Sequence, residues 1–213
     1  MTVKLVHVTP EGDELIAYMA RVSNPSNQSN PNNFKLIKYL VKHNHWSPFE
    51  MVNMCVEINT TRSISAQILR HRSFSFQEFS QRYANVDELE LPIPPNLRLQ
   101  DPTNRQNSID NVSEFKQSSL QNIININFIQ TYQLYQNLIK AGIAKECARD
   151  VLPLASPTKL YMNGTLRSWL HYIDLRSANG TQLEHQTIAN QIKLLVKQYF
   201  PNSYLAFFSS NDT

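Results

Sequence analysis

Strand-like and helix-like hydrophobic patterns follow one another irregularly along this 213-residue chain. Residues 3–8, 52–58 and 158–162 are rich in β-branched and other apolar side chains, which is typical of strands. Apolar residues at helical spacing predict helices over residues 13–22, 34–42, 61–69, 112–141, 145–152, 165–175 and 183–199. Because this order is not a βα repeat, we predict an α+β fold with a central mixed or antiparallel sheet packed with several helices.

Local signals refine this outline. Gly142 is expected to end the longest helix, and Asn163–Gly164 is expected to turn the chain after the last strand. The residues after Arg72 are predicted to be extended, so that two-residue alternation would point Ser80 and Arg82 the same way.

The length and the hydrophobic fraction of 41% predict one domain over residues 1–213. Residues 91–110 are rich in proline and polar side chains and predict a long surface excursion, either a variable loop or a lid over an active site. The apolar stripe of residues 112–141 fits a core or a subunit interface. A charged fraction of only 17% also fits a surface partly covered by subunit contacts.

Composition disfavours several classes of protein. A net charge of +3 is too small to indicate a nucleic-acid or membrane partner. Cys55 and Cys147 form neither a disulfide framework nor a CxxC pair, so we expect no metal site. The first residues lack the apolar core of a signal peptide, and no apolar stretch approaches the ~18 to 20 residues that span a bilayer. We therefore expect a cytoplasmic protein.

Residues 70–82 read RHRSFSFQEFSQR and concentrate the candidate chemistry. Arginine forks bind phosphate or carboxylate through paired hydrogen bonds, and neighbouring hydroxyls add directional contacts. This composition suits a nucleotide or another phosphorylated ligand. It also suits a nucleic-acid-binding module that uses arginine for phosphate contact and phenylalanine for base stacking.

Other polar residues extend this candidate site. Gln67 precedes Arg70 by one helical turn, so both side chains can face one ligand. Residues 45–50, HWSPFE, place an imidazole, a hydroxyl and a carboxylate before the strand at 52–58. We find no GxGxxG or phosphate-binding P-loop, so any flavin must be held outside a Rossmann-type turn. There is also no GxSxG, which ranks a serine hydrolase last among the alternatives.

The segment 70–82 matches every specified position of RHRxxSxxxxSxR, and it thereby resembles the flavin-dependent thymidylate synthases. Three further stretches carry the same resemblance. Residues 45–50 match His-x-[Ser/Thr]-Pro-x-Glu, residues 148–153 match ARxxLP, and Arg176 matches an arginine at the uracil ring. The resemblance runs from the first strand to Gln186, and residues 91–110 match least.

The resemblance assigns roles residue by residue. It implies catalytic positions at Arg176 and Ser80. Of these, Ser80 is expected to position the substrate rather than to act as a nucleophile. It implies flavin contacts at Ser47, Glu50, Arg70, His71, Arg72, Glu78, Thr165, Leu166, Arg167 and His171, the last standing where many members have Asn. It implies deoxyuridylate (dUMP) contacts at Gln67, Arg70, Glu78, Phe79, Ser80, Gln81, Arg82, Arg149 and Arg176.

The same resemblance implies the reaction. Uracil carbon 5 is a poor nucleophile, and neither cysteine has a setting that suggests attack on the ring. The family instead converts dUMP to dTMP with FAD as hydride carrier, NADPH as reductant and 5,10-methylenetetrahydrofolate as carbon donor, and it releases tetrahydrofolate. The resemblance also implies a homotetramer with active sites between chains. We expect no metal ion in the site. The alternative, a non-enzymatic nucleic-acid-binding module, predicts salt-dependent polynucleotide binding and no flavin.

Overall fold

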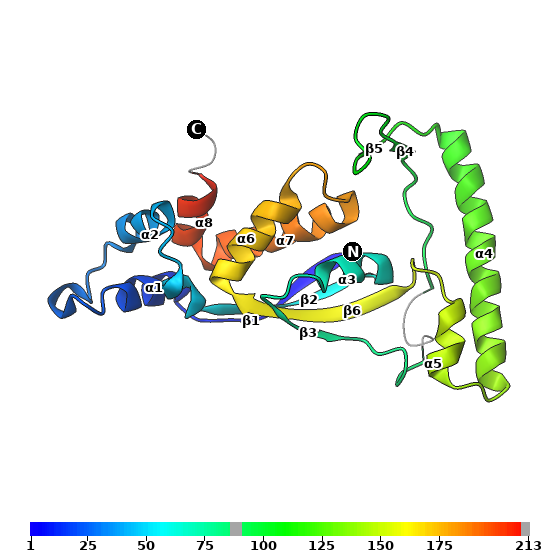
Figure 1. Ribbon diagram of the computed structural model, residues 1–213, viewed down its shortest axis with the longest axis horizontal. Coiled ribbons are helices and arrows are strands. Elements are labelled where there is room, and N and C mark those ends of the chain that lie inside the picture. Colours follow the sequence, from blue (N-terminus) through cyan, green and yellow to red (C-terminus); the bar gives the residue numbers. More distant parts are fainter. Residues whose placement is uncertain (86–90, 210–213) are drawn as a thin grey trace.

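A computed structural model describes residues 1–85 and 91–209 and shows an α+β fold (Figure 1). Its main sheet has four strands in the order β1-β2-β6-β3. They span Thr2–Val8 (β1), Asn53–Thr61 (β2), Pro157–Thr165 (β6) and Ser75–Glu78 (β3). Every neighbouring pair is antiparallel, so the predicted fold class is confirmed and the sheet is not mixed.

The pairing of β2 with β6 forms the centre of the main sheet. All nine residues of β2 pair with β6, from Asn53 opposite Thr165 to Thr61 opposite Pro157. Met54, Val56 and Ile58 alternate along β2 and are fully buried, as period-two packing on one face requires. That face packs against α6 (Leu166–Ser177) and α7 (Leu183–Tyr199), whose inner residues complete the core.

Two predicted helices and one that the sequence pattern did not reveal gather at one end of the sheet (Figure 1). These are α1 (Gly12–Ala20), α2 (Asn33–Lys42) and α8 (Pro201–Phe208). Buried Asp13 accepts hydrogen bonds from the backbone N–H groups of Asn202 (2.7 Å) and Ser203 (3.2 Å), and from the Ser203 hydroxyl. A side chain distant in sequence therefore caps α8, and the one local signal of its start is Pro201 at the first helical position.

Helix α4 (Glu114–Lys140) stands away from the sheet beside α5 (Lys145–Ala148) (Figure 1). Of its residues only Tyr135 is buried, whereas Phe115 is 87% and Ile123 is 61% exposed. The end of the apolar stripe around Tyr135 packs in a small core with Ala148 of α5, whereas most of the stripe is not core within this chain. The helix stops as expected at Gly142, which has a φ of 82°.

The remaining elements are short. Helix α3 (Arg62–Ile68) follows β2 directly, and 3₁₀ turns cover Pro25–Asn27, Ser47–Glu50 and Arg149–Val151. Within the excursion at 91–110, β4 (Leu99–Gln100) and β5 (Ser108–Ile109) form a small hairpin. Across the described ranges, none of the helices combines the length and apolarity needed to cross a membrane.

Two local predictions are wrong. Asn163 and Gly164 do not form a turn, because β6 continues through both to Thr165. Gly164 is needed there for a different reason: a Cβ at this position would lie 2.3 Å from Cδ1 of Phe74. Nor does two-residue alternation relate Ser80 to Arg82, since the chain turns after Ser80, whose carbonyl accepts from the N–H of Tyr83 and Ala84.

Candidate functional site

The predicted site residues fall into three groups along β6. The α6-start group comprises Ser47, Glu50, Thr165, Leu166, Arg167 and His171. The central group comprises Gln67, Arg70, His71, Arg72 and Arg176. The α5-side group comprises Phe79, Ser80, Gln81, Arg82 and Arg149. Because α5 shortly precedes β6 and α6 directly follows it, the outer groups lie at opposite ends of this nine-residue strand, on the order of 30 Å apart (Figure 1).

In the central group, Arg176 at the end of α6 meets His71 after α3. The Arg176 Nε–H donates to His71 Nε2 at 2.8 Å, so this ring nitrogen carries no proton and the imidazole is neutral. Burial, together with the charges of Arg176 and Arg70, lowers the pKa of His71 to about 4. The Arg176 guanidinium is thereby oriented by a neutral acceptor.

Arg70 and Arg72 flank His71 and are exposed. Within the described residues, neither guanidinium is engaged by a carboxylate or by another hydrogen-bond acceptor. Two unpaired guanidinium groups beside a half-buried imidazole form a site to which a diphosphate or another anion can bind. This donor set fits the phosphates of a dinucleotide such as FAD.

Gln67 contacts His185, which in turn contacts Tyr172, and the sequence patterns singled out neither of these two residues. His185 Nδ1 lies 3.3 Å from Gln67 Oε1, and His185 Nε2 lies 2.9 Å from the Tyr172 hydroxyl. His185 belongs to the buried face of α7, together with Ile188, Ala189 and others. The sequence signal for His185 was its position in a helical stripe of aliphatic residues. A histidine on such a buried face requires hydrogen-bond partners, because buried polar groups are rarely left without them.

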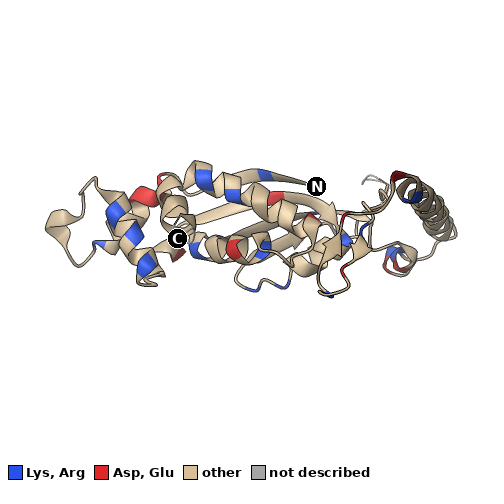
Figure 2. Cartoon of the chain, turned by 90° about the horizontal axis from the view of Figure 1, so that it is seen from above, with Lys and Arg blue, Asp and Glu red and all other residues tan. Residues whose placement is uncertain are grey.

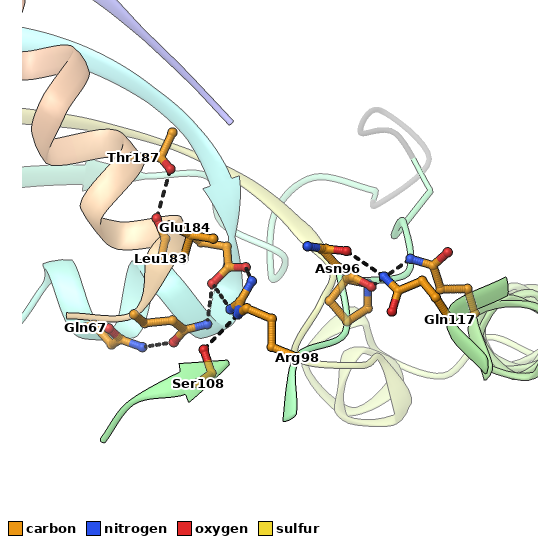
Figure 3. A network of polar contacts seen from close by, with 11 residues as sticks. Gln67, Asn96, Arg98, Ser108, Gln117, Leu183, Glu184 and Thr187 are labelled. Carbon is orange, nitrogen blue, oxygen red and sulfur yellow. Dashed lines mark hydrogen bonds and ion pairs between the residues drawn. The ribbon is translucent and has the colours of Figure 1, made fainter. Parts of the chain in front are cut away.

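The excursion at 91–110 is attached to α7 by a paired ion contact (Figure 3). Arg98 donates from its two Nη atoms to the two carboxylate oxygens of Glu184, at 2.7 and 2.9 Å. The pKa of Glu184 is lowered by its hydrogen bonds from Arg98 and Gln182, against the opposing effect of burial. Arg98 therefore fixes one point of the excursion beside the central group.

In the α6-start group, Arg167 forms an ion pair with Glu50. Thr165 caps α6 by accepting from the Ser168 N–H at 3.3 Å. Ser47, Glu50 and Arg167 line a cavity of about 600 Å³ together with His45 and Trp46. The Trp46 ring also contacts the ring of His171, with centroids 4.7 Å apart. This apolar cavity with a few polar groups fits an aromatic ligand such as a flavin.

Glu78 is satisfied within the chain. One of its carboxylate oxygens accepts from Ser65 (2.6 Å), Thr158 (2.9 Å) and Arg62 (2.8 Å), and its side chain is 15% exposed. These three contacts tie β3 to α3 and β6. Glu78 therefore holds the motif segment in place, whatever ligand its second oxygen contacts.

The α5-side group is built around Glu146. Arg82 forms an ion pair with this carboxylate at 3.2 Å, and Arg149 Nε donates to the Glu146 carbonyl at 3.3 Å. Gln81 has a buried Nε2 without a hydrogen-bond partner in the described structure. The only hydrogen bond of the Ser80 hydroxyl there is from the Arg82 N–H, so no neighbouring base activates it as a nucleophile.

Acidification is expected to weaken the fold between pH 6.5 and about 4. Both His71 and His185 have a pKa of about 4, below the ordinary 6.5, mainly because they are buried. In this range the unfolded chain binds more protons than the folded one, so the free energy of unfolding decreases as the pH is lowered. Thermal unfolding from pH 8 to pH 4 measures this slope. His185→Gln should have a shallower slope than the parent, and identical slopes would contradict the assignment.

Taken together, the antiparallel sheet and its arginine, amide and hydroxyl groups define an α+β protein suited to binding phosphorylated ligands. The sequence and the fold also match known proteins. The chain belongs to the family of thymidylate synthase complementing proteins, Thy1, whose family model matches residues 4–202.

Two relatives cover almost the whole chain. A probable flavin-dependent thymidylate synthase of Paramecium bursaria Chlorella virus 1 is 50% identical over 210 residues, which are 95% of this chain and 96% of the relative. A flavin-dependent thymidylate synthase of Synechocystis sp. is 48% identical over 194 residues, covering 91% and 87% of the two chains.

A solved structure has the same fold. The UMP/dUMP methylase PolB of Streptomyces cacaoi, crystallised with 5-Br dUMP, superposes with a TM-score of 0.85. It is 27% identical, and the match covers 98% of this chain and 94% of PolB. The family resemblance drawn from the motif at 70–82 is therefore confirmed.

Proposed function

We propose that this protein is a cytoplasmic flavin-dependent thymidylate synthase that methylates dUMP to dTMP. It takes the carbon from 5,10-methylenetetrahydrofolate and the reducing equivalents from NADPH, and it releases tetrahydrofolate. The observation that carries the proposal is the pairing of Arg176 with neutral His71, next to the unpaired Arg70 and Arg72. The relatives named above are thymidylate synthases of the same kind, and the structural neighbour acts on UMP and dUMP.

FAD, when bound, supplies the hydride that completes the methyl group. The chain's own residues hold it: we assign the isoalloxazine and adenine contacts to Ser47, Glu50, Thr165, Leu166, Arg167 and His171, and the phosphate contacts to Arg70, His71 and Arg72. The Glu50–Arg167 ion pair forms part of the wall of the cavity to which we assign the aromatic ring.

Arg176 is assigned to the uracil ring. Methylation at carbon 5 builds negative charge on the ring oxygens, and fixed N–H donors stabilise such charge in a partly buried site. Arginine cannot act as a base near neutral pH, because its pKa is above about 12. Arg176 therefore stabilises an anion and does not take a proton.

The phosphate of dUMP is assigned to the α5-side group. Arg82 and Arg149 converge on Glu146, and the Arg82 side chain is 55% exposed, so its remaining donors are accessible. Phe79, Ser80, Gln81 and the second oxygen of Glu78 complete the proposed substrate contacts. The buried Nε2 of Gln81 is a donor for which a substrate oxygen would be a partner.

Arg82→Ala is expected to weaken dUMP binding ten- to a hundredfold, the size of one hydrogen bond to a charged group. Calorimetric titration of the flavin-loaded protein with dUMP gives the dissociation constant. Arg105→Ala, which removes an exposed arginine of the excursion, is the matched control and should bind as the parent does. An unchanged constant for Arg82→Ala would remove Arg82 from the substrate site.

We further propose one domain over residues 1–213 that assembles as a homotetramer with sites between chains. Two observations support this assembly. The apolar residues of α4, including Phe115 and Ile123, are exposed in the single chain and suit a subunit contact. The two outer groups lie at opposite ends of β6, too far apart for one small ligand to touch both within one chain.

The alternative of a nucleic-acid-binding module has no supporting observation. Figure 2 shows Lys and Arg spread over the length of the molecule and interspersed with Asp and Glu, rather than gathered on one element. Such a distribution does not form the continuous basic track that a polynucleotide requires.

The experiment that tests the function is a visible spectrum of the purified protein after loading with FAD and desalting. Retained flavin that bleaches with anaerobic NADPH, followed by dTMP formation from dUMP and methylenetetrahydrofolate, is the expected result. Light scattering on the same sample should give about four times the chain mass of 24.6 kDa. A colourless protein that binds polynucleotide in a salt-dependent way would instead support the alternative.

A further inference from the structure

A directed chain of hydrogen bonds passes through Gln67, and Figure 3 shows its outer part, from Gln67 to Glu184. On one side of Gln67, its Oε1 faces His185 Nδ1 at 3.3 Å, and His185 in turn meets the Tyr172 hydroxyl. On the other side, Gln67 Nε2 donates to Gln182 Oε1 at 2.7 Å, and Gln182 Nε2 donates to Glu184 at 2.9 Å. The chain thus runs from the core under α6 to the ion pair that anchors the excursion.

The proton positions on the buried side of this chain follow from the orientation of the Gln67 amide, whose oxygen faces His185. The amide oxygen of Gln67 can only accept, so His185 Nδ1 carries the hydrogen and donates it. The other nitrogen, Nε2, then accepts from the Tyr172 hydroxyl. His185 is completely buried and Tyr172 almost so. Burial lowers the pKa of His185 and raises that of Tyr172, so the imidazole is neutral and the phenol protonated near neutral pH.

The exposed side fixes this orientation of the Gln67 amide. The Glu184 carboxylate, held by Arg98, can only accept, so Gln182 must turn its NH₂ group toward Glu184 and its oxygen toward Gln67. Gln67 must then turn its NH₂ group toward Gln182. The Glu184 end of the chain therefore requires the Gln67 oxygen to face the core and its NH₂ group to face outward, and the His185 tautomer that donates from Nδ1 matches this orientation.

We propose that His185, oriented by Tyr172, is a positioning residue that holds the Gln67 amide with its NH₂ group toward dUMP. The inference rests on the proposed contact of Gln67 with the substrate. One N–H of that group is used by Gln182, and the second is left for a ligand. The groups that dUMP offers are mainly acceptors, its phosphate oxygens and uracil carbonyls, and a rotated amide would set an oxygen against them.

Two substitutions separate orientation from packing. His185→Asn places an amide N–H near the position of Nδ1, so it can still donate to Gln67. His185→Gln places its amide near the position of Nε2, so it can meet Tyr172 but not Gln67. We expect His185→Gln to raise KM for dUMP about tenfold, the size of one net hydrogen bond, with kcat within about threefold of the parent. His185→Asn should restore KM to within about threefold.

Equal KM values for His185→Asn and His185→Gln would overturn the inference. Tyr172→Phe gives a second test, because it removes a single buried oxygen without leaving a large cavity. The KM for dUMP should rise at least about threefold. An unchanged KM would equally overturn the inference. Flavin retention and the unfolding temperature are followed for each variant.

Gln67→Met tests the assumption beneath the inference. It removes the amide while keeping the side-chain length, and it should raise KM about as much as His185→Gln. A parental KM would show that Gln67 does not contact the substrate, and the inference would fall with that assignment. Raised KM for Gln67→Met with parental KM for both His185 variants would instead remove only the positioning role.

Discussion

Replacement of Arg176 by alanine is expected to leave FAD bound and to lower the rate of dTMP formation at least about a hundredfold. Preorganised donors at a developing anion are worth roughly 10²–10³ in rate. Among the described residues, the sole hydrogen-bond partner of the Arg176 side chain is His71, so its Nη donors are free for the uracil. The rate is measured under saturating dUMP, and the bound flavin is measured by its visible absorption.

Two controls sharpen this prediction. Arg176→Lys should also be slow, because an ammonium group lacks the planar fork that can donate to His71 and the substrate together. Arg105→Ala removes an exposed arginine that lies outside all three groups and should turn over at the parental rate. Parental turnover by Arg176→Ala, with flavin retained, would exclude the proposed anion stabilisation.

The second large effect is expected from Gly164→Ala. The added methyl group would lie 2.3 Å from Cδ1 and 2.6 Å from Cε1 of Phe74. This ring cannot yield easily, since it packs against Trp169 at a centroid distance of 4.6 Å and also contacts Tyr172. Overpacking of this kind costs about 1–3 kcal/mol in the free energy of unfolding. Phe74 follows Arg72 and precedes β3, so its displacement should also weaken dUMP binding.

Gly12→Ala is the matched control for this variant. Its Cβ would lie at the same distance, 2.3 Å, from the ring of Phe200, which is in the terminal part of the core and outside the three groups. We expect both variants to unfold at lower temperature, but only Gly164→Ala to bind dUMP more weakly. Parental dUMP affinity in folded Gly164→Ala would show that the motif segment tolerates the shift of Phe74.

Most of the fold follows from local patterns, and the exceptions have specific causes. Periodicity located β1, β2 and the helices α1, α2, α4, α6 and α7. Helix α8 was not predicted because its capping carboxylate, Asp13, lies about 190 residues away in sequence. Gly164 was misread as a turn residue because the need for a glycine there is set by the ring of Phe74, which lies about 90 residues earlier in the chain, just before β3.

The candidate site, like the fold, could be predicted from the sequence only in part. The motif at 70–82 could be recognised from the sequence alone, since its functional residues are close together along the chain. Its pairing of His71 with Arg176 spans 105 residues and needed the fold. His185 escaped notice because its partners, Tyr172 and Gln67, lie on two other elements, and a lone histidine in an apolar stripe carries no indication of what it orients.

The long separation between β2 and β6 also affects how the chain must be made. Strand β2 ends at Thr61 and β6 begins at Pro157, so more than ninety residues are synthesised before the central strand can acquire its second neighbour. Until then β2 has one open edge and an apolar surface without its covering helices, a species prone to aggregation on the ribosome. Chain closure over such a distance is slow, so completion of the sheet sets the pace of folding.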